Sequence, residues 1–151
     1  MSSTRRLRGP GGLILVAAFA VSAAAFGCKK DQAGGEGGAP GGSPVDQIKV
    51  PDIQYSSAQA DIDKGKELFT AKGCNACHKL GGGKLVGPDL KGVTARRDKQ
   101  WIAKMIMKPD VMIKEDPVAK ELFKTHLTPM PSQGVAEAEL PLIMSYLKAN
   151  E

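Results

Sequence analysis

The feature that most restricts this chain is a five-residue segment with two cysteines and a histidine, Cys74-Asn75-Ala76-Cys77-His78. The order C-x-x-C-H is typical of a c-type haem attachment site. Cysteines three residues apart on one helical turn can each reach one vinyl group of the same haem, and the histidine that follows lies beneath the iron. The segment therefore predicts one covalent haem c on Cys74 and Cys77, with His78 as an axial iron ligand.

Two other kinds of site also contain C-x-x-C. A thioredoxin-like redox pair occurs in a βαβ context, which this sequence does not indicate. A structural zinc site needs a second pair of ligands, and only His126 remains to supply one. Haem attachment is the interpretation that the surrounding residues favour.

Around this motif the chain resembles a class I bacterial cytochrome c, over about residues 62–148. Four pieces carry the resemblance and stand in the family's order: GKELFTAKGCNACH, VGPDLKGV, TPMPSQGV and SYLKAN. The resemblance implies an all-α fold, with about four to five helices wrapped around one covalently bound haem. It also implies that the first and last helices cross, with Gly65 against Tyr146.

Gly87-Pro88 follows the haem motif by ten residues. In the family that the chain resembles, the corresponding proline carbonyl accepts the other ring proton of the axial histidine. Such a bond fixes the tautomer of the ring and makes it a better ligand. The resemblance thus implies that Pro88 holds His78 in place. Read without it, Gly-Pro is an ordinary turn.

The sixth iron ligand decides between electron transfer and chemistry at iron. Met130 stands between Pro129 and Pro131, and prolines fix the backbone angle φ in a rigid, non-helical segment that can present a thioether. The distal methionine of the family has the same setting, so we expect Met130 to be the sixth ligand. The other methionines after the N-terminus are expected to fill space, in helices or, for one of them, in a short connector: Met105, Met107, Met144 and Met112.

Two further side chains have open roles. His126 is the alternative sixth ligand, and bis-histidine ligation would lower the reduction potential relative to histidine–methionine ligation. A lone histidine is more often a surface group or a partner of a ligand. Trp101 either packs in the core or donates its indole N–H to a haem propionate.

The N-terminus predicts export. Residues 2–8, SSTRRLR, are basic and precede an apolar run of 14 residues from Leu13 to Phe26. This run is too short for a typical membrane-spanning helix and suits a signal peptide. An uncleaved anchor helix is the alternative. We expect residues 1–27 to be removed.

The third cysteine, Cys28, needs its own explanation, because the haem motif uses the other two. Ala25-Phe26-Gly27-Cys28 resembles a bacterial lipobox, which implies a lipoprotein signal peptide and a lipidated Cys28. Ordinary cleavage that leaves Cys28 free or removes it is the alternative. More than one acyl chain gives stable membrane anchoring.

Two regions follow the signal peptide. Residues 28–56 contain six glycines and three prolines without apolar periodicity, which predicts a flexible tether. Residues 57–151 are the expected cytochrome c domain. Its first helix is expected over residues 58–72 with Gly73 as the C-terminal cap, and its last helix starts near Ala136 or is displaced toward Leu140 by Pro141.

Charge argues against a nucleic-acid binder. The formal charge of +5 falls to +2 without the three signal-peptide arginines, because 18 basic residues then face 16 acidic ones. Six basic residues lie near the haem motif in sequence and form either a docking ring for an acidic partner or a solvated face: Lys72, Lys79, Lys84, Lys91, Arg96 and Arg97.

Together these features predict a single-electron carrier, not an enzyme, in an extracytoplasmic respiratory or related redox chain. Its expected partners are redox proteins and a membrane reached through the lipid anchor, with no nucleic acid and no small-molecule substrate. A haem enzyme or gas-binding sensor with an open or weak sixth position is the alternative. The domain could also be a docked subunit of a larger oxidoreductase, which the tether permits.

Overall fold

The computed structural model describes residues 42–151, so the predicted signal peptide, Cys28 and the start of the predicted tether lie outside the described residues. The described part contains six α-helices, one short 3-10 helix and no strand. The elements are α1 (Gln59–Ala71), η1 (Cys74–Ala76), α2 (Val93–Arg96), α3 (Lys99–Met107), α4 (Pro109–Glu115), α5 (Pro117–His126) and α6 (Leu140–Ala149). The all-α prediction is confirmed.

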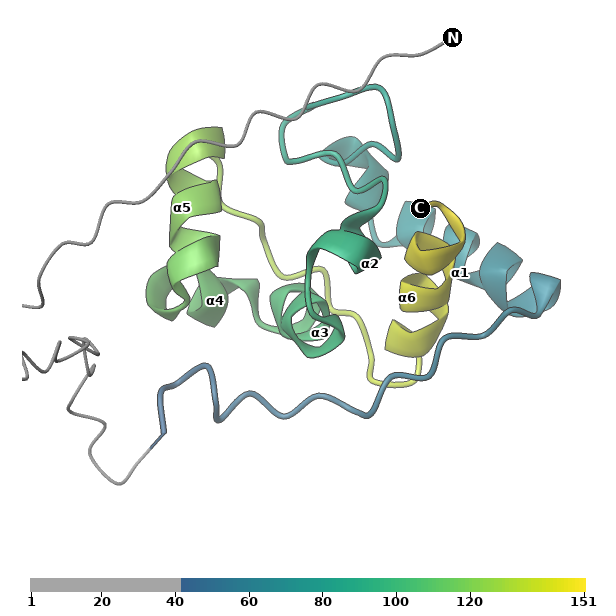
Figure 1. Ribbon diagram of the computed structural model, residues 1–151, viewed down its shortest axis with the longest axis horizontal. Helices are drawn as coiled ribbons and strands as arrows, with labels where there is room; N and C mark the ends of the chain where they lie inside the picture. Colours follow the sequence, from purple (N-terminus) through teal and green to yellow (C-terminus); the bar gives the residue numbers. More distant parts are fainter. Residues whose placement is uncertain (1–41) are drawn as a thin grey trace, which may run out of the picture. The chain divides into compact units, whose positions relative to one another are not determined.

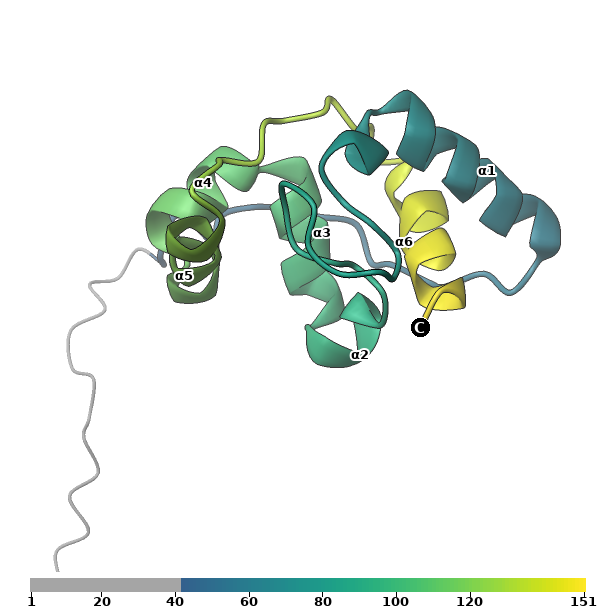
Figure 2. The same cartoon turned by 90° about the horizontal axis from the view of Figure 1, so that it is seen from above.

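The helices form two pairs with α3 between them. Helices α1 and α6 pack together at one end, and α4 packs against α5 at the other (Figures 1 and 2). The segment between α5 and α6 connects the two ends. More helices are present than expected, because α2 forms a single turn and α4 lies where a short connector was expected.

The contact between α1 and α6 depends on one small residue. A Cβ atom on Gly65 would lie 2.1 Å from the backbone oxygen of Leu142 and 2.8 Å from Tyr146 Cβ. One turn further, the rings of Phe69 and Tyr146 meet edge to face with their centroids 5.5 Å apart. The expected contact between Gly65 and Tyr146 is therefore present.

Capping residues stand at the ends of several helices. Gly73 follows α1 in the left-handed conformation, with φ of 72°, which a residue without a Cβ adopts readily. The side chain of Asp98 accepts hydrogen bonds from the backbone N–H groups of Gln100 and Trp101 at the start of α3. Asp116 does the same for Ala119 in α5.

Helix α6 begins at Leu140, the displaced start that Pro141 suggested. In the first turn of a helix, the N–H that proline lacks has no partner within the helix, so Pro141 costs no backbone hydrogen bond there.

One methionine differs from expectation. Met112 lies within α4 and is fully buried instead of lying in a connector.

The chain before α1 is part of the packed domain. Ile53 is fully buried and belongs to the same apolar cluster as Phe69 and Leu147. The backbone N–H of Ser56 donates to Ser145 Oγ at 2.9 Å, and Ser145 is itself buried within α6. Residues 50–56 thus pack on the domain and are not part of the tether. The burial of Ile53 could not be predicted, because the residues around it show no apolar periodicity.

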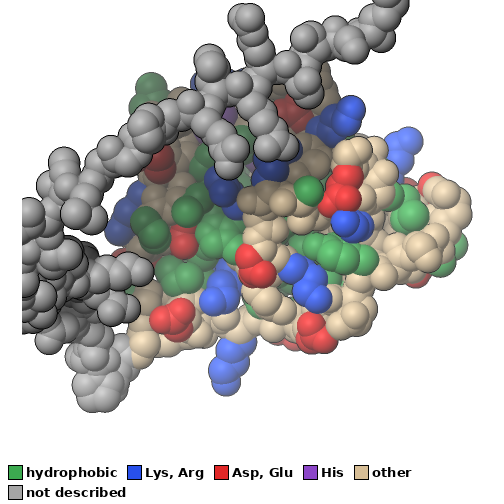
Figure 3. All heavy atoms as spheres, in the orientation of Figure 1, with side chains coloured by type: hydrophobic (Ala, Val, Ile, Leu, Met, Phe, Trp, Pro, Cys, Tyr) green, Lys and Arg blue, Asp and Glu red, His purple; other side chains and the backbone are tan. Residues whose placement is uncertain are grey.

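Among residues 42–151, no helix combines the length and the apolar character needed to cross a membrane. On the face of the molecule drawn in Figure 3, basic and acidic side chains are interspersed over the described surface.

Candidate functional site

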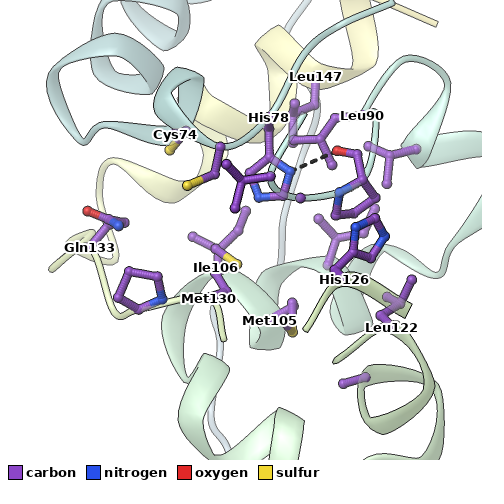
Figure 4. A pocket seen from close by; sticks show the side chains of 18 of the residues that line it. Cys74, His78, Leu90, Met105, Ile106, Leu122, His126, Met130, Gln133 and Leu147 are labelled. Carbon is purple, nitrogen blue, oxygen red and sulfur yellow. Dashed lines mark hydrogen bonds between the residues drawn. The ribbon is translucent and has the colours of Figure 1, made fainter. Parts of the chain in front are cut away.

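A cavity of about 220 Å³ opens between the η1 segment, α3 and the chain that follows α5. The five residues that the sequence assigns to haem attachment, to iron ligation and to support of His78 all line it: Cys74, Cys77, His78, Pro88 and Met130. Figure 4 shows this pocket with the Cys74 side chain at one side, His78 above and Met130 below. The structure brings these five together, and Cys28 lies outside the described residues.

A tight turn presents the two cysteines. Gly73 turns the chain out of α1, and the backbone N–H of His78 donates to the carbonyl oxygen of Cys74 at 2.9 Å. Within residues 42–151 both cysteines are unpaired, and both are half-buried. Burial raises the pKa of the Cys74 thiol, which favours its protonated form. Two thiols on one turn at a cavity wall suit attachment to two points of one flat group.

A backbone carbonyl holds the His78 ring in place. Its Nδ1 lies 2.9 Å from the carbonyl oxygen of Pro88, the hydrogen bond that the family resemblance implies. A carbonyl only accepts, so Nδ1 carries the proton and Nε2 keeps its lone pair for a metal. Burial lowers the pKa of His78, against the opposing effect of the Pro88 bond, and so keeps the imidazole neutral, which is the form that binds iron.

Gly87 is a site residue that the sequence analysis treated only as part of a turn. A Cβ atom on it would lie 2.6 Å from Cε1 of His78 and 2.9 Å from Nδ1. Its backbone N–H donates to the carbonyl oxygen of Cys77 at 2.8 Å. Glycine is needed at this position for close approach to the ring, and the only sequence signal was its place before Pro88.

Asp89 is the second residue that the sequence analysis missed. Its Oδ1 accepts hydrogen bonds from the backbone N–H groups of Gly81 and Lys91, each at 2.8 Å, and its Oδ2 accepts one from Gly83 at 2.7 Å. These bonds, that from Lys91 first, lower the pKa of Asp89. An aspartate after proline in a glycine-rich loop is a turn signal, and could have indicated this.

Met130 reaches the cavity from the segment after α5. Leu127 ends that helix in the left-handed conformation, with φ of 56°, and the chain then passes through Pro129 and Pro131 without helical structure. Met130 is half-buried. Its side chain and that of His78 lie on facing walls of the pocket in Figure 4.

Two buried nitrogen atoms in the cavity wall have no hydrogen-bond partner among the described residues. They are Nε1 of Trp101 and Nδ1 of His126, and both residues line the pocket. A buried polar group without a partner costs free energy unless a ligand satisfies it. The indole N–H of Trp101 could donate to a haem propionate, so the wall fits a haem, and the Trp101 ring also packs against the apolar core.

Several of the six basic side chains near the haem motif form ion pairs or hydrogen bonds with other residues of this chain. Lys72 pairs with Glu139 at 2.7 Å, which lowers the pKa of that carboxyl. Lys84 Nζ donates to the carbonyl oxygen of Thr125, and Arg96 donates to that of Asp89. These contacts join separate segments of the chain, so the six residues are not a uniform ring of free charges.

Comparison with known proteins agrees with this site. Residues 62–151 match the family described as cytochrome c. Cytochrome c from Rhodothermus marinus is 31% identical, with 72% of this chain and 89% of that chain covered and a TM-score of 0.59. An engineered form of that cytochrome bound to a carbene intermediate is 30% identical over 72% and 89% of the two chains, with a TM-score of 0.56.

The cytochrome c domain of a Pseudomonas putida protein is 33% identical, with 56% of this chain and 85% of that chain covered and a TM-score of 0.50. No curated protein matches the chain by sequence. The family match spans more than half of the chain, and the site holds the cysteines and histidine of a haem attachment motif. The chain therefore belongs to the cytochrome c family and is similar to its bacterial class I members, with one covalent haem c as its cofactor.

Proposed function

We propose that this protein carries single electrons on one haem c whose axial ligands are His78 and Met130. The observation that carries the proposal is the position of these two side chains on facing walls of one cavity that Cys74 and Cys77 also line. A bound haem c supplies one-electron chemistry between Fe(III) and Fe(II). A haem held by both side chains would leave no iron position for a substrate.

The residues of the chain orient the cofactor and set its environment. The Pro88 carbonyl keeps the proton of His78 on Nδ1 and makes the imidazole a stronger donor. Methionine as the second ligand favours a higher reduction potential than a second histidine would. The apolar wall, which includes Ile106 and Leu147, limits access of water to the site.

Absence of enzymatic activity is part of the proposal. The carbene intermediate is bound to an engineered relative, and that finding concerns the engineered protein. The alternative function, a haem enzyme or gas sensor, requires Met130 to leave the iron. The test is carbon monoxide binding to the reduced protein at neutral pH. An electron carrier binds it slowly and weakly, whereas fast, tight binding without unfolding contradicts the proposal.

We further propose that the domain works outside the cytoplasm, on the periplasmic side or at the cell surface, in a respiratory or related redox chain. The basis is the N-terminal sequence: residues 1–27 as a lipoprotein signal peptide, and Cys28 as the lipidated residue. Mass spectrometry of the mature protein tests this. Acyl chains on Cys28 support it, and an unmodified N-terminus beyond Cys28 contradicts it.

The partners are an electron donor and an electron acceptor of protein nature. Exposed cations such as Lys79 and Lys91 lie near the haem-binding segment and would steer an acidic partner. Such steering predicts that electron-transfer rates with an acidic redox protein fall as ionic strength rises. An unchanged rate between low and high salt argues against electrostatic docking.

A further inference from the structure

The loop between the haem motif and Pro88 has no helical structure, yet it holds a hydrogen bond to His78. Gly81, Gly82 and Gly83 have φ values of 98°, 91° and 87°, so three successive residues adopt a conformation that glycine tolerates. Such a segment loses much conformational entropy when it is ordered. The Pro88 carbonyl nevertheless lies 2.9 Å from His78 Nδ1. Something must hold the loop in register with the histidine.

The Asp89 carboxylate is the group that does so. It accepts the backbone N–H groups of Gly81 and Gly83 on one side and that of Lys91 on the other. Asp89 directly follows Pro88, so the carboxylate and the carbonyl that bonds His78 belong to two adjacent residues. The backbone N–H of Leu90 also donates to the carbonyl oxygen of Lys79 at 2.8 Å.

Arg96 fixes the same segment from the other direction. Its Nη2 donates to the Asp89 carbonyl oxygen at 3.0 Å, and its Nη1 donates to that of Lys91. The backbone of Asp89 is thus bonded to Arg96 of α2, and its side chain is bonded to the glycine segment. Without these bonds, motion of the glycine segment would also displace the Pro88 carbonyl.

We propose that Asp89 is a positioning residue for the axial histidine: by closing the Gly81–Gly83 segment, its carboxylate fixes the Pro88 carbonyl on His78 Nδ1. This inference rests on the proposed function, in which His78 binds the iron. A well-ordered carbonyl at Nδ1 raises the basicity of the imidazole and stabilises Fe(III). Loss of the Asp89 carboxylate should therefore raise the reduction potential as well as loosen the loop.

The test uses the holoprotein with the variants Asp89→Ala and Asp89→Asn. Asp116→Ala is the matched control, because Asp116 also accepts a backbone N–H, at 2.8 Å, but lies far along the chain at the start of α5. The first measurement is the rate at which the His78 Nδ1 proton exchanges with solvent, which NMR detects in the diamagnetic reduced protein. The second is the reduction potential.

We expect Asp89→Ala to speed this exchange by about tenfold or more, which corresponds to about 1.4 kcal/mol, and to raise the potential. Asp89→Asn should fall between Asp89→Ala and wild type, because its one amide oxygen can still accept some of these bonds. The asparagine variant also serves as the test if Asp89→Ala does not fold. Asp116→Ala should lower stability without changing either property.

Wild-type exchange and potential in both Asp89 variants would overturn the inference and leave Asp89 a purely structural residue. Equal changes in Asp116→Ala would overturn it too, since the effect would then follow from general loosening. These results are distinct from failure of the proposed function, which would appear in the wild-type protein as a haem without histidine ligation.

Discussion

Gly87 lies so close to the imidazole of His78 that a Cβ atom on it would stand 2.6 Å from Cε1 and 2.9 Å from Nδ1. The Gly87→Ala variant should therefore push the ring away from the Pro88 carbonyl. We expect the holoprotein to lose about 1–3 kcal/mol of unfolding free energy and its reduction potential to rise. Urea unfolding and potentiometric titration measure the two effects.

Gly134→Ala is the control for this prediction. Gly134 has a positive φ of 60°, so alanine is strained there, but its Cβ would meet no atom of the described part of the chain within 4 Å. It should cost stability while leaving the potential as in wild type. A Gly87→Ala protein with the wild-type potential would show that the ring can move without consequence, and the close approach of Gly87 would then have no role in setting the potential.

A second prediction concerns the crossing of α1 and α6. Gly65→Ala would place a Cβ atom 2.1 Å from the Leu142 backbone oxygen, so the two helices must separate. We expect a loss of about 3 kcal/mol or more in unfolding free energy, at the upper end of overpacking effects. The exposed neighbour Lys66→Ala should change it by no more than about 0.5 kcal/mol. Equal, small effects of both substitutions would rule out a tight crossing.

A third prediction tests whether the chain before α1 belongs to the domain. Ile53 is fully buried, so Ile53→Ala should lower the unfolding free energy by about 2–5 kcal/mol. The exposed Gln54→Ala is the control and should be nearly neutral. If Ile53→Ala were also neutral in thermal or urea unfolding, this segment would be a tether after all.

Local signals explain why much of the fold could be predicted. The first helix ends, as expected, at a glycine in the left-handed conformation. Asp98 and Asp116 cap α3 and α5, and an aspartate directly before a helix is a cap signal that the sequence alone carries. The haem-binding residues stand in short motifs whose spacing reflects one cofactor. In each case the information lies within a few neighbouring residues.

The features that could not be predicted depend on contacts between distant parts of the chain. Ile53 stands in a polar, proline-containing segment, and it is buried in a cluster whose other members lie far along the sequence, from Phe69 to Leu147. Met112 became a helix residue because Pro109 begins a new helix as readily as it ends one. The bonds of Asp89 go to N–H groups whose positions exist only once the loop is folded.

The fourth prediction is a pH dependence. Backbone N–H groups, that of Lys91 first, lower the pKa of Asp89 in the folded protein. A lowered folded-state pKa means that the ionised carboxylate adds stability above the unfolded value of about 3.9. This contribution is lost as the pH falls below about 4 and through the folded pKa. The difference in unfolding free energy between wild type and Asp89→Asn should thus shrink toward acid pH. A difference independent of pH would contradict this.

The most direct test of the central claim, ligation of the haem iron by His78 and Met130, is the near-infrared absorption spectrum of the oxidised holoprotein. We predict the weak sulfur-to-iron charge-transfer band of histidine–methionine ligation in wild type. We also expect the band in His126→Ala and its loss in Met130→Ala, because Met130 presents its thioether opposite His78 in the pocket. A covalent haem whose wild-type spectrum lacks the band, or keeps it in Met130→Ala, would contradict this ligation.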